Sequence, residues 1–102
     1  MPVSAAKILI ADDHALIREG MVSLLGRFDN IGTVAEAADG KTALSILLSV
    51  PVDFAILDIR LPGLTGLDVA QEVRSRGIET RLMLMTGEMG EQAAAAAIRD
   101  LS

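Results

Sequence analysis

Three carboxylates stand directly after short apolar runs of a kind that forms buried strands. Asp12 and Asp13 follow the first run, and Asp58 follows a later one. Thr86 follows the last such run, and the small Gly87 after it leaves room around the hydroxyl. If the runs are parallel strands, these side chains gather at one edge of a sheet. Clustered carboxylates repel one another unless a cation neutralises them, and an oxygen-rich, partly hydrated site suits Mg²⁺ better than zinc.

Each of these residues also has an ordinary structural interpretation. Asp12 and Asp13 could cap a helix, because Asp is a favoured N-cap that stabilises the positive end of the helix dipole. Asp58 could be only the first polar residue after a strand, and Thr86 could hydrogen-bond locally. His14 is the sole histidine, and we expect it to line the rim of the pocket in the first turn of a helix rather than to bind a metal or donate a phosphoryl group, because one histidine does not make a site. The structural interpretations do not easily account for the whole set.

The composition indicates one small domain. The chain has 102 residues, of which 51 % are hydrophobic but only 2 % aromatic, so its core must consist of aliphatic side chains. A net charge of −5 argues against a DNA-binding surface within these residues. The absence of cysteine excludes disulfides and thiolate zinc sites. The apolar stretch before Asp12 is too short for a signal peptide or a membrane span, so we expect a cytoplasmic protein without a membrane partner.

The elements that position these residues alternate regularly. Short apolar runs at 7–11, 33–37, 53–57 and 81–85 predict four strands, and the more polar 33–37 suits a sheet edge. Apolar residues at helical spacing predict helices around 17–28, after Asp39 and Gly40, from Gly66 to about Gly77, and over 94–101. This alternation predicts an α/β fold with a doubly wound parallel sheet and helices on both faces. If the strand order is the flavodoxin-like 2-1-3-4, the strands at 7–11 and 53–57 are neighbours. That order brings the three carboxylates into one shallow pocket.

Three segments of the sequence resemble the receiver domains of bacterial response regulators. They are ILIADDHALIREGM at 8–21, AILDIRLPGLTGLDV at 55–69 and LMLMTGE at 82–88, and the resemblance runs from about residue 7 to about residue 97. It is strongest to the subgroup that carries a LuxR-type helix-turn-helix output domain. The resemblance implies a receiver domain over residues 1–102, in a two-component system that regulates transcription. DNA would then be contacted only through an output domain outside these residues.

The same resemblance assigns roles to individual residues. Asp58 would accept a phosphoryl group from a histidine kinase, and Thr86 would be the switch hydroxyl that moves toward that group. Asp13, Asp58 and the backbone carbonyl of Arg60 would bind Mg²⁺ directly, and Asp12 would reach the ion through water. Such a domain is a timed switch, so we expect no enzyme activity on an external substrate.

Receivers also have a fifth strand with a lysine that pairs with the phosphoryl group, and a fifth helix. This sequence ends at Ser102, in or just after the fourth expected helix, which predicts a truncated receiver. Its two lysines, Lys7 and Lys41, lie elsewhere in the sequence. The strand at 81–85 would then be an edge strand, although it is apolar on both faces and lacks the features that protect natural edges. We therefore expect a homodimer or strand exchange through this strand.

Two other functions are compatible with the sequence. A receiver-like module that binds proteins without being phosphorylated would not need the lysine. A Mg²⁺-dependent phosphohydrolase of similar architecture would also use an Asp at a strand end. Such an enzyme usually needs a second acid two residues after the nucleophile, and this chain has Arg60 there.

Overall fold

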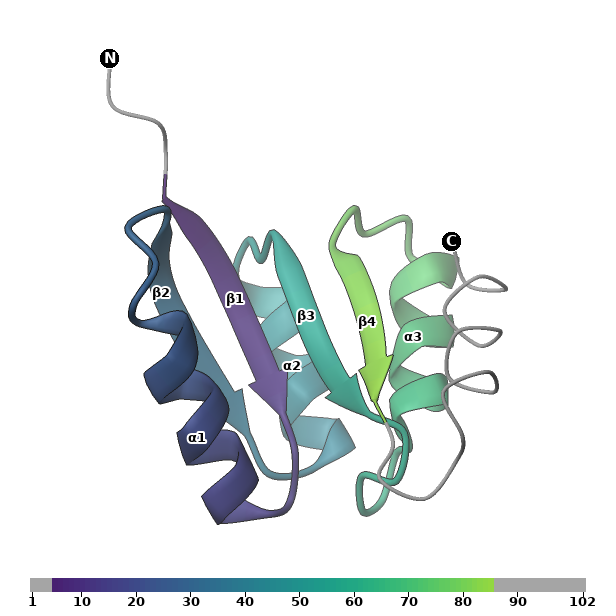
Figure 1. Cartoon of the computed structure of the whole chain (residues 1–102). Helices are drawn as coiled ribbons and strands as arrows, with labels where there is room; N and C mark the ends of the chain where they lie inside the picture. The colour runs from purple at the N-terminus through teal and green to yellow at the C-terminus, as the bar shows by residue number, and fades with distance from the viewer. Residues whose placement is uncertain (1–4, 86–102) are drawn as a thin grey trace.

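The described part of the chain folds into a four-stranded parallel sheet with helices on both faces (Figure 1). The computed structural model describes residues 5–85, apart from the side chain of Thr33. The strand order is β2-β1-β3-β4, which confirms the predicted flavodoxin-like order. In chain order the elements are β1 (Ala6–Ala11), α1 (Ala15–Leu25), β2 (Ile31–Ala37), α2 (Gly40–Ser49), β3 (Phe54–Asp58), α3 (Gly66–Ser75) and β4 (Arg81–Met85).

The predicted elements are confirmed, with small differences at their ends. β2 begins at Ile31, two residues before the predicted start, and it lies at the edge of the sheet as its polarity indicated. β3 continues through Asp58, which is therefore the last residue of the strand and does not follow it. α1 ends at Leu25, so Phe28 lies outside the helix and donates its N–H to the Leu25 carbonyl at 3.1 Å. The predicted helix over 94–101 lies outside the described residues.

Local sequence signals account for the ends of α2 and α3. Asp39 caps α2 by accepting a hydrogen bond from the Thr42 N–H at 2.7 Å. At the start of α3, Thr65 and Asp68 form a reciprocal capping box. Gly77, with φ of 71°, follows the end of α3 in the left-handed conformation. The helices of residues 5–85 have 10 or 11 residues, and none is long and apolar enough to cross a membrane.

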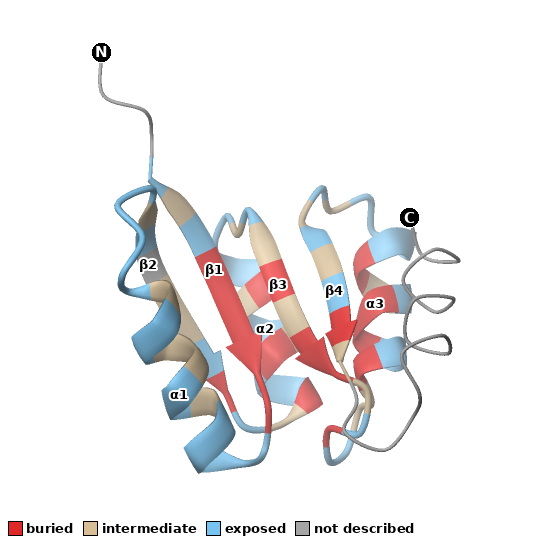
Figure 2. Ribbon diagram, viewed as in Figure 1, coloured by how far each residue is buried: buried red, intermediate tan, exposed pale blue. Residues whose placement is uncertain are grey.

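The two faces of the sheet are covered unequally. α2 and α3 pack side by side on one face, and α1 lies on the other face against β1 and β2 (Figure 1). Figure 2 shows that buried positions concentrate in β1, at the end of β3 and on the sides of α2 and α3 that face the sheet, whereas no residue of α1 is buried. The main core therefore lies between the sheet and α2–α3, and it includes Leu9, Ala55, Leu57, Leu84, Val69 and Val73.

The face that carries α1 is more open toward β4. Ile10, Ile56 and Met83 are register partners on neighbouring parallel strands, so their side chains share this face. Ile10 is fully buried, Ile56 is half-buried and Met83 is exposed. On this face, the burial of side chains thus falls from β1 through β3 to β4 among the described residues.

The unequal covering makes a prediction about stability. Leu9→Ala removes a fully buried side chain from the main core and should lower the free energy of unfolding by about 2–5 kcal/mol. Leu16→Ala is the matched control, because Leu16 in α1 is 82 % exposed and its loss should change stability by only about 0.5 kcal/mol. Urea denaturation measures both variants, and equal losses would contradict the described core.

Candidate metal centre

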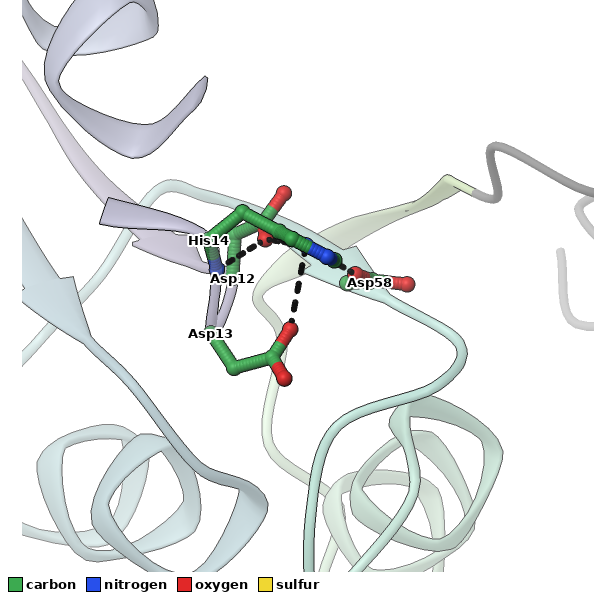
Figure 3. A group of neighbouring side chains, drawn as sticks. All are labelled: Asp12, Asp13, His14 and Asp58. Carbon is green, nitrogen blue, oxygen red and sulfur yellow. Dashed lines mark hydrogen bonds and ion pairs between the residues drawn. The ribbon is translucent and has the colours of Figure 1, made fainter. Parts of the chain in front are cut away.

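The pairing of β1 with β3 brings the predicted carboxylates together. Ala11 and Leu57 are register partners, so the residues that follow them, Asp12 and Asp58, lie at the same carboxyl edge of the sheet. Asp12 is 2 % exposed and Asp58 is 7 % exposed, whereas Asp13 lies in the loop before α1 and is exposed. Figure 3 shows the three carboxylates around one small space, as the sequence predicted.

His14 completes this group. Its Nδ1 atom lies 3.0 Å from Asp12 Oδ1, 3.2 Å from Asp13 Oδ1 and 4.0 Å from Asp58 Oδ2. One donor atom from each of the four residues lies within 4.8 Å of all the others (Figure 3). We expected His14 at the rim of the pocket, and the structure brings its ring to Asp12 and Asp13 with the side chain 64 % exposed. The signal in the sequence was its place directly after the two aspartates.

Backbone N–H groups orient the two buried carboxylates. His14 donates its N–H to Asp12 Oδ1 at 2.8 Å, and Arg60 donates its N–H to Asp58 Oδ1 at 3.0 Å. Each carboxylate therefore accepts a hydrogen bond from the residue two positions later, which leaves Asp58 Oδ2 as the oxygen that faces His14. The N-cap of α1 is His14 itself, without a side-chain capping bond. The alternative that Asp12 and Asp13 serve as caps is therefore not supported.

Arg18 holds the loop that carries this group, a role that the sequence analysis missed. Its Nη1 donates to the backbone carbonyl of Asp12 at 2.6 Å, and its Nε donates to Glu36 Oε1 at 3.0 Å. The guanidinium thus ties α1 to the end of β1 and to β2 without contacting the Asp12 carboxylate through these bonds. Its spacing of one helical turn after His14 was the available signal.

The negative charge of the group affects the pKa of His14. The hydrogen bond with the Asp12 carboxylate raises the pKa of His14, and the nearby charge of Asp13 raises it further. The site therefore favours a positive charge at its centre. Three carboxylates, two of them buried, form the oxygen donor set that hard divalent cations prefer, so the residues fit Mg²⁺.

The structure does not place two of the predicted site residues within this group. Arg60 directs its N–H to Asp58, and the role of its carbonyl as a metal ligand stays a prediction. Thr86 lies outside the described residues, so its role as the switch hydroxyl also stays a prediction.

A glycine allows α3 to begin close to the backbone of Asp58. Gly66, the first residue of α3, donates its N–H to the Ile59 carbonyl at 3.1 Å. A Cβ atom at Gly66 would lie 2.5 Å from the carbonyl oxygen of Asp58, closer than real Cβ contacts come. The start of α3 can therefore approach the end of β3 only because residue 66 has no side chain.

These features define an α/β domain with an acidic cluster at the carboxyl edge of its sheet. The family profile of the response regulator receiver domain matches residues 8–100. The chain therefore belongs to the receiver domains of response regulators, which confirms the resemblance that the sequence indicated.

Known proteins of the same family support this assignment. The chain is 40 % identical over 80 residues, 78 % of its length, to the probable transcriptional regulatory protein NarL of Mycobacterium tuberculosis. Its fold matches the signal receiver domain of NarL from that organism with a TM-score of 0.87 at 34 % identity, covering 98 % of this chain and 80 % of the other. A LuxR-family two-component response regulator from Aurantimonas sp. SI85-9A1 matches with a TM-score of 0.83 at 30 % identity, covering 97 % and 70 %. The chain spans well under half the length of the curated relatives it matches.

The close approach at Gly66 can be tested directly. Gly66→Ala should destabilise the domain by about 1–3 kcal/mol, because the neighbour that must move is backbone and cannot change rotamer. Gly20→Ala is the matched control: Gly20 lies inside α1 with open space around it, and Ala there should stabilise by about 0.4–1 kcal/mol. Thermal melts followed by circular dichroism would disprove the packing argument if both variants shifted in the same direction.

Proposed function

We propose that this receiver domain accepts a phosphoryl group on Asp58 from the phosphohistidine of a histidine kinase. The observation that carries the proposal is the position of Asp58, a nearly buried carboxylate at a strand end within the same group as Asp12 and Asp13. In the transfer, the bond between phosphorus and the kinase imidazole breaks while a bond to an Asp58 oxygen forms. Such transfers depend on positioning and charge neutralisation more than on covalent help from the protein.

Asp13 and Asp58 would hold Mg²⁺ directly, together with the Arg60 carbonyl, and Asp12 would reach it through water. When bound, the ion neutralises charge on the phosphoryl oxygens. The chain's own contribution is to hold the acceptor still. The Arg60 N–H fixes Asp58 Oδ1, Gly66 supports the Asp58 backbone, and Asp13 provides an exposed carboxylate at the mouth of the site.

Phosphorylation at Asp58 would act as a switch and not as a step in the turnover of an external substrate. An aspartyl phosphate hydrolyses slowly, so the signal lasts for a limited time. Thr86 would move toward the phosphoryl group and change the packing beside β4. We further propose that this signal acts in the cytoplasm and regulates transcription through a DNA-binding output domain, which the name of the NarL relative as a transcriptional regulatory protein supports.

The acceptor can be identified with a small-molecule phosphodonor such as acetyl phosphate in the presence of Mg²⁺. Wild type should incorporate alkali-labile phosphate, and Asp58→Asn should incorporate none, because the amide keeps the shape but is not an anionic nucleophile. Asp53→Asn is the matched control, since Asp53 lies before β3 and accepts a hydrogen bond from the Lys7 N–H.

The same experiment separates the alternatives. Phosphate incorporation that persists in Asp58→Asn would place the acceptor elsewhere. Catalytic release of phosphate without stable labelling would indicate a phosphohydrolase, and no labelling of wild type would favour the module that binds proteins without phosphorylation.

We also propose that a second copy of the chain can pair along β4. Within residues 5–85, β4 pairs only with β3. On that side the Arg81 N–H donates to the Asp53 carbonyl, and the Met85 carbonyl accepts from the Ile59 N–H. Because backbone polar groups alternate along a strand, those of Leu82 face the other edge. An apolar edge strand without Lys, Pro or a bulge is a template for pairing.

A backbone substitution tests this pairing without relying on side-chain packing. Leu82→Pro removes an outward N–H and should abolish association that depends on concentration, as measured by light scattering. Leu82→Ala is the control, because it shortens the same side chain and keeps the N–H. A wild-type chain that is monomeric at all concentrations would contradict the proposal.

A further inference from the structure

An arginine lies in α1 at a position where its neighbours at helical spacing are apolar. Arg18, Val22 and Leu25 recur at this spacing, and all three are half-buried, whereas most residues of α1 are exposed. The side chain of Arg18 is only 18 % exposed. Removing a guanidinium from water is unfavourable, and a buried ion pair is often no more stabilising than an apolar side chain of similar size. Stability alone therefore does not explain an arginine at this position.

The contacts of Arg18 lead to the backbone of Asp12 and to β2. Its Nη1 donates to the Asp12 carbonyl at 2.6 Å, and its Nε donates to Glu36 Oε1 at 3.0 Å. The Asp12 N–H donates in turn to the Ala37 carbonyl of β2 at 3.0 Å. Both backbone polar groups of Asp12 are therefore held from β2, the N–H directly and the carbonyl through Arg18 and Glu36.

The Asp12 carbonyl belongs to the peptide group that joins Asp12 to Asp13. Because a peptide group is planar, a hydrogen bond that fixes the direction of its carbonyl also fixes the direction in which the chain continues to Asp13. Asp13 lies in the loop before α1 and is exposed, so packing restrains its position less than that of the buried Asp12. The charged donor makes the bond from Arg18 stronger than an ordinary hydrogen bond. Arg18 thus restrains the exposed carboxylate of the group through the backbone.

We propose that Arg18 is a positioning residue for the Asp13 carboxylate, and that Glu36 holds the guanidinium in place for this task. The inference rests on the proposed function, in which Asp13 binds Mg²⁺ directly. Arg18 acts through the peptide group between Asp12 and Asp13 and not by contact with the ion. Groups that orient metal ligands in this way change metal affinity by about tenfold to a hundredfold when they are removed.

Two other roles for Arg18 make different predictions. If Arg18 were only a positive charge near the carboxylates, Arg18→Met would bind Mg²⁺ more tightly than wild type, and Arg18→Lys would bind it equally. If Arg18 were only a link between α1 and the sheet, Arg18→Met would melt at a lower temperature but would bind Mg²⁺ as wild type does. The positioning role predicts weaker binding in both variants, because lysine keeps the charge but lacks the rigid fork that reaches the carbonyl and Glu36 together.

The test measures Mg²⁺ binding to the full chain by isothermal titration, and thermal melts without metal check that each variant is folded. Arg18→Met should weaken Mg²⁺ binding by about tenfold and Arg18→Lys by less. Should Arg18→Met not fold, Arg18→Lys decides the matter. Arg76→Met is the matched control, because Arg76 Nε also bonds a glutamate, Glu72, at 2.9 Å, but lies at the end of α3. It should leave Mg²⁺ binding unchanged.

A double-mutant cycle tests the part assigned to Glu36. Glu36→Ala should weaken Mg²⁺ binding in the wild-type chain and have no further effect in Arg18→Met, because Glu36 acts through Arg18. An equal loss in both chains would show that Glu36 acts through its own charge and would overturn its assigned part.

The role of Arg18 and the proposed function can fail separately. Mg²⁺ binding that is unchanged or tighter in the Arg18 variants, or a wild type that binds no Mg²⁺, would overturn the role of Arg18. Phosphate incorporation at Asp58 of the wild type would still support the proposed function in the first case. A wild type that binds Mg²⁺ without taking up phosphate would contradict the proposed function, and the titrations would still decide the role of Arg18.

Discussion

The parallel pairing of β1 with β3 is the constraint on which the site depends. It places Asp12 and Asp58 side by side at the carboxyl edge of the sheet, where both are almost fully buried. Bringing two buried carboxylates together is unfavourable unless their oxygens receive hydrogen bonds or a cation. The N–H groups of His14 and Arg60 supply the hydrogen bonds, and the edge keeps a cluster of negative charge.

Burial of the aliphatic core offsets the repulsion between the two carboxylates. Leu9 and Leu57, which lie shortly before the two carboxylates in their strands, are fully buried against α2 and α3. Their burial keeps the strands adjacent despite the repulsion at the strand ends. Gly66 then allows α3 to begin against the backbone of Asp58, so the core and the site share the same supporting contact. The position of the Asp58 backbone follows from this packing.

The opposite face of the sheet is the less constrained part of the domain. α1 buries none of its residues, and exposure on this face rises from Ile10 to Met83. Helix α1 is nevertheless connected to the site, because Arg18 contacts the Asp12 carbonyl and His14 forms the N-cap.

The sequence by itself determined the order of the elements, the sheet order, the receiver family and the meeting of Asp12, Asp13 and Asp58. The order of the elements follows from periodicity, and the receiver family and the sheet order follow from the three segments that resemble receiver domains. The meeting of the three carboxylates follows from that order and from the rule that parallel strands end at one edge. The tertiary structure decided that β3 includes Asp58, that Gly66 lies against it and that the His14 ring turns over the carboxylates. Those features depend on rotamers and on contacts between segments distant in the chain, which spacing along a sequence does not encode.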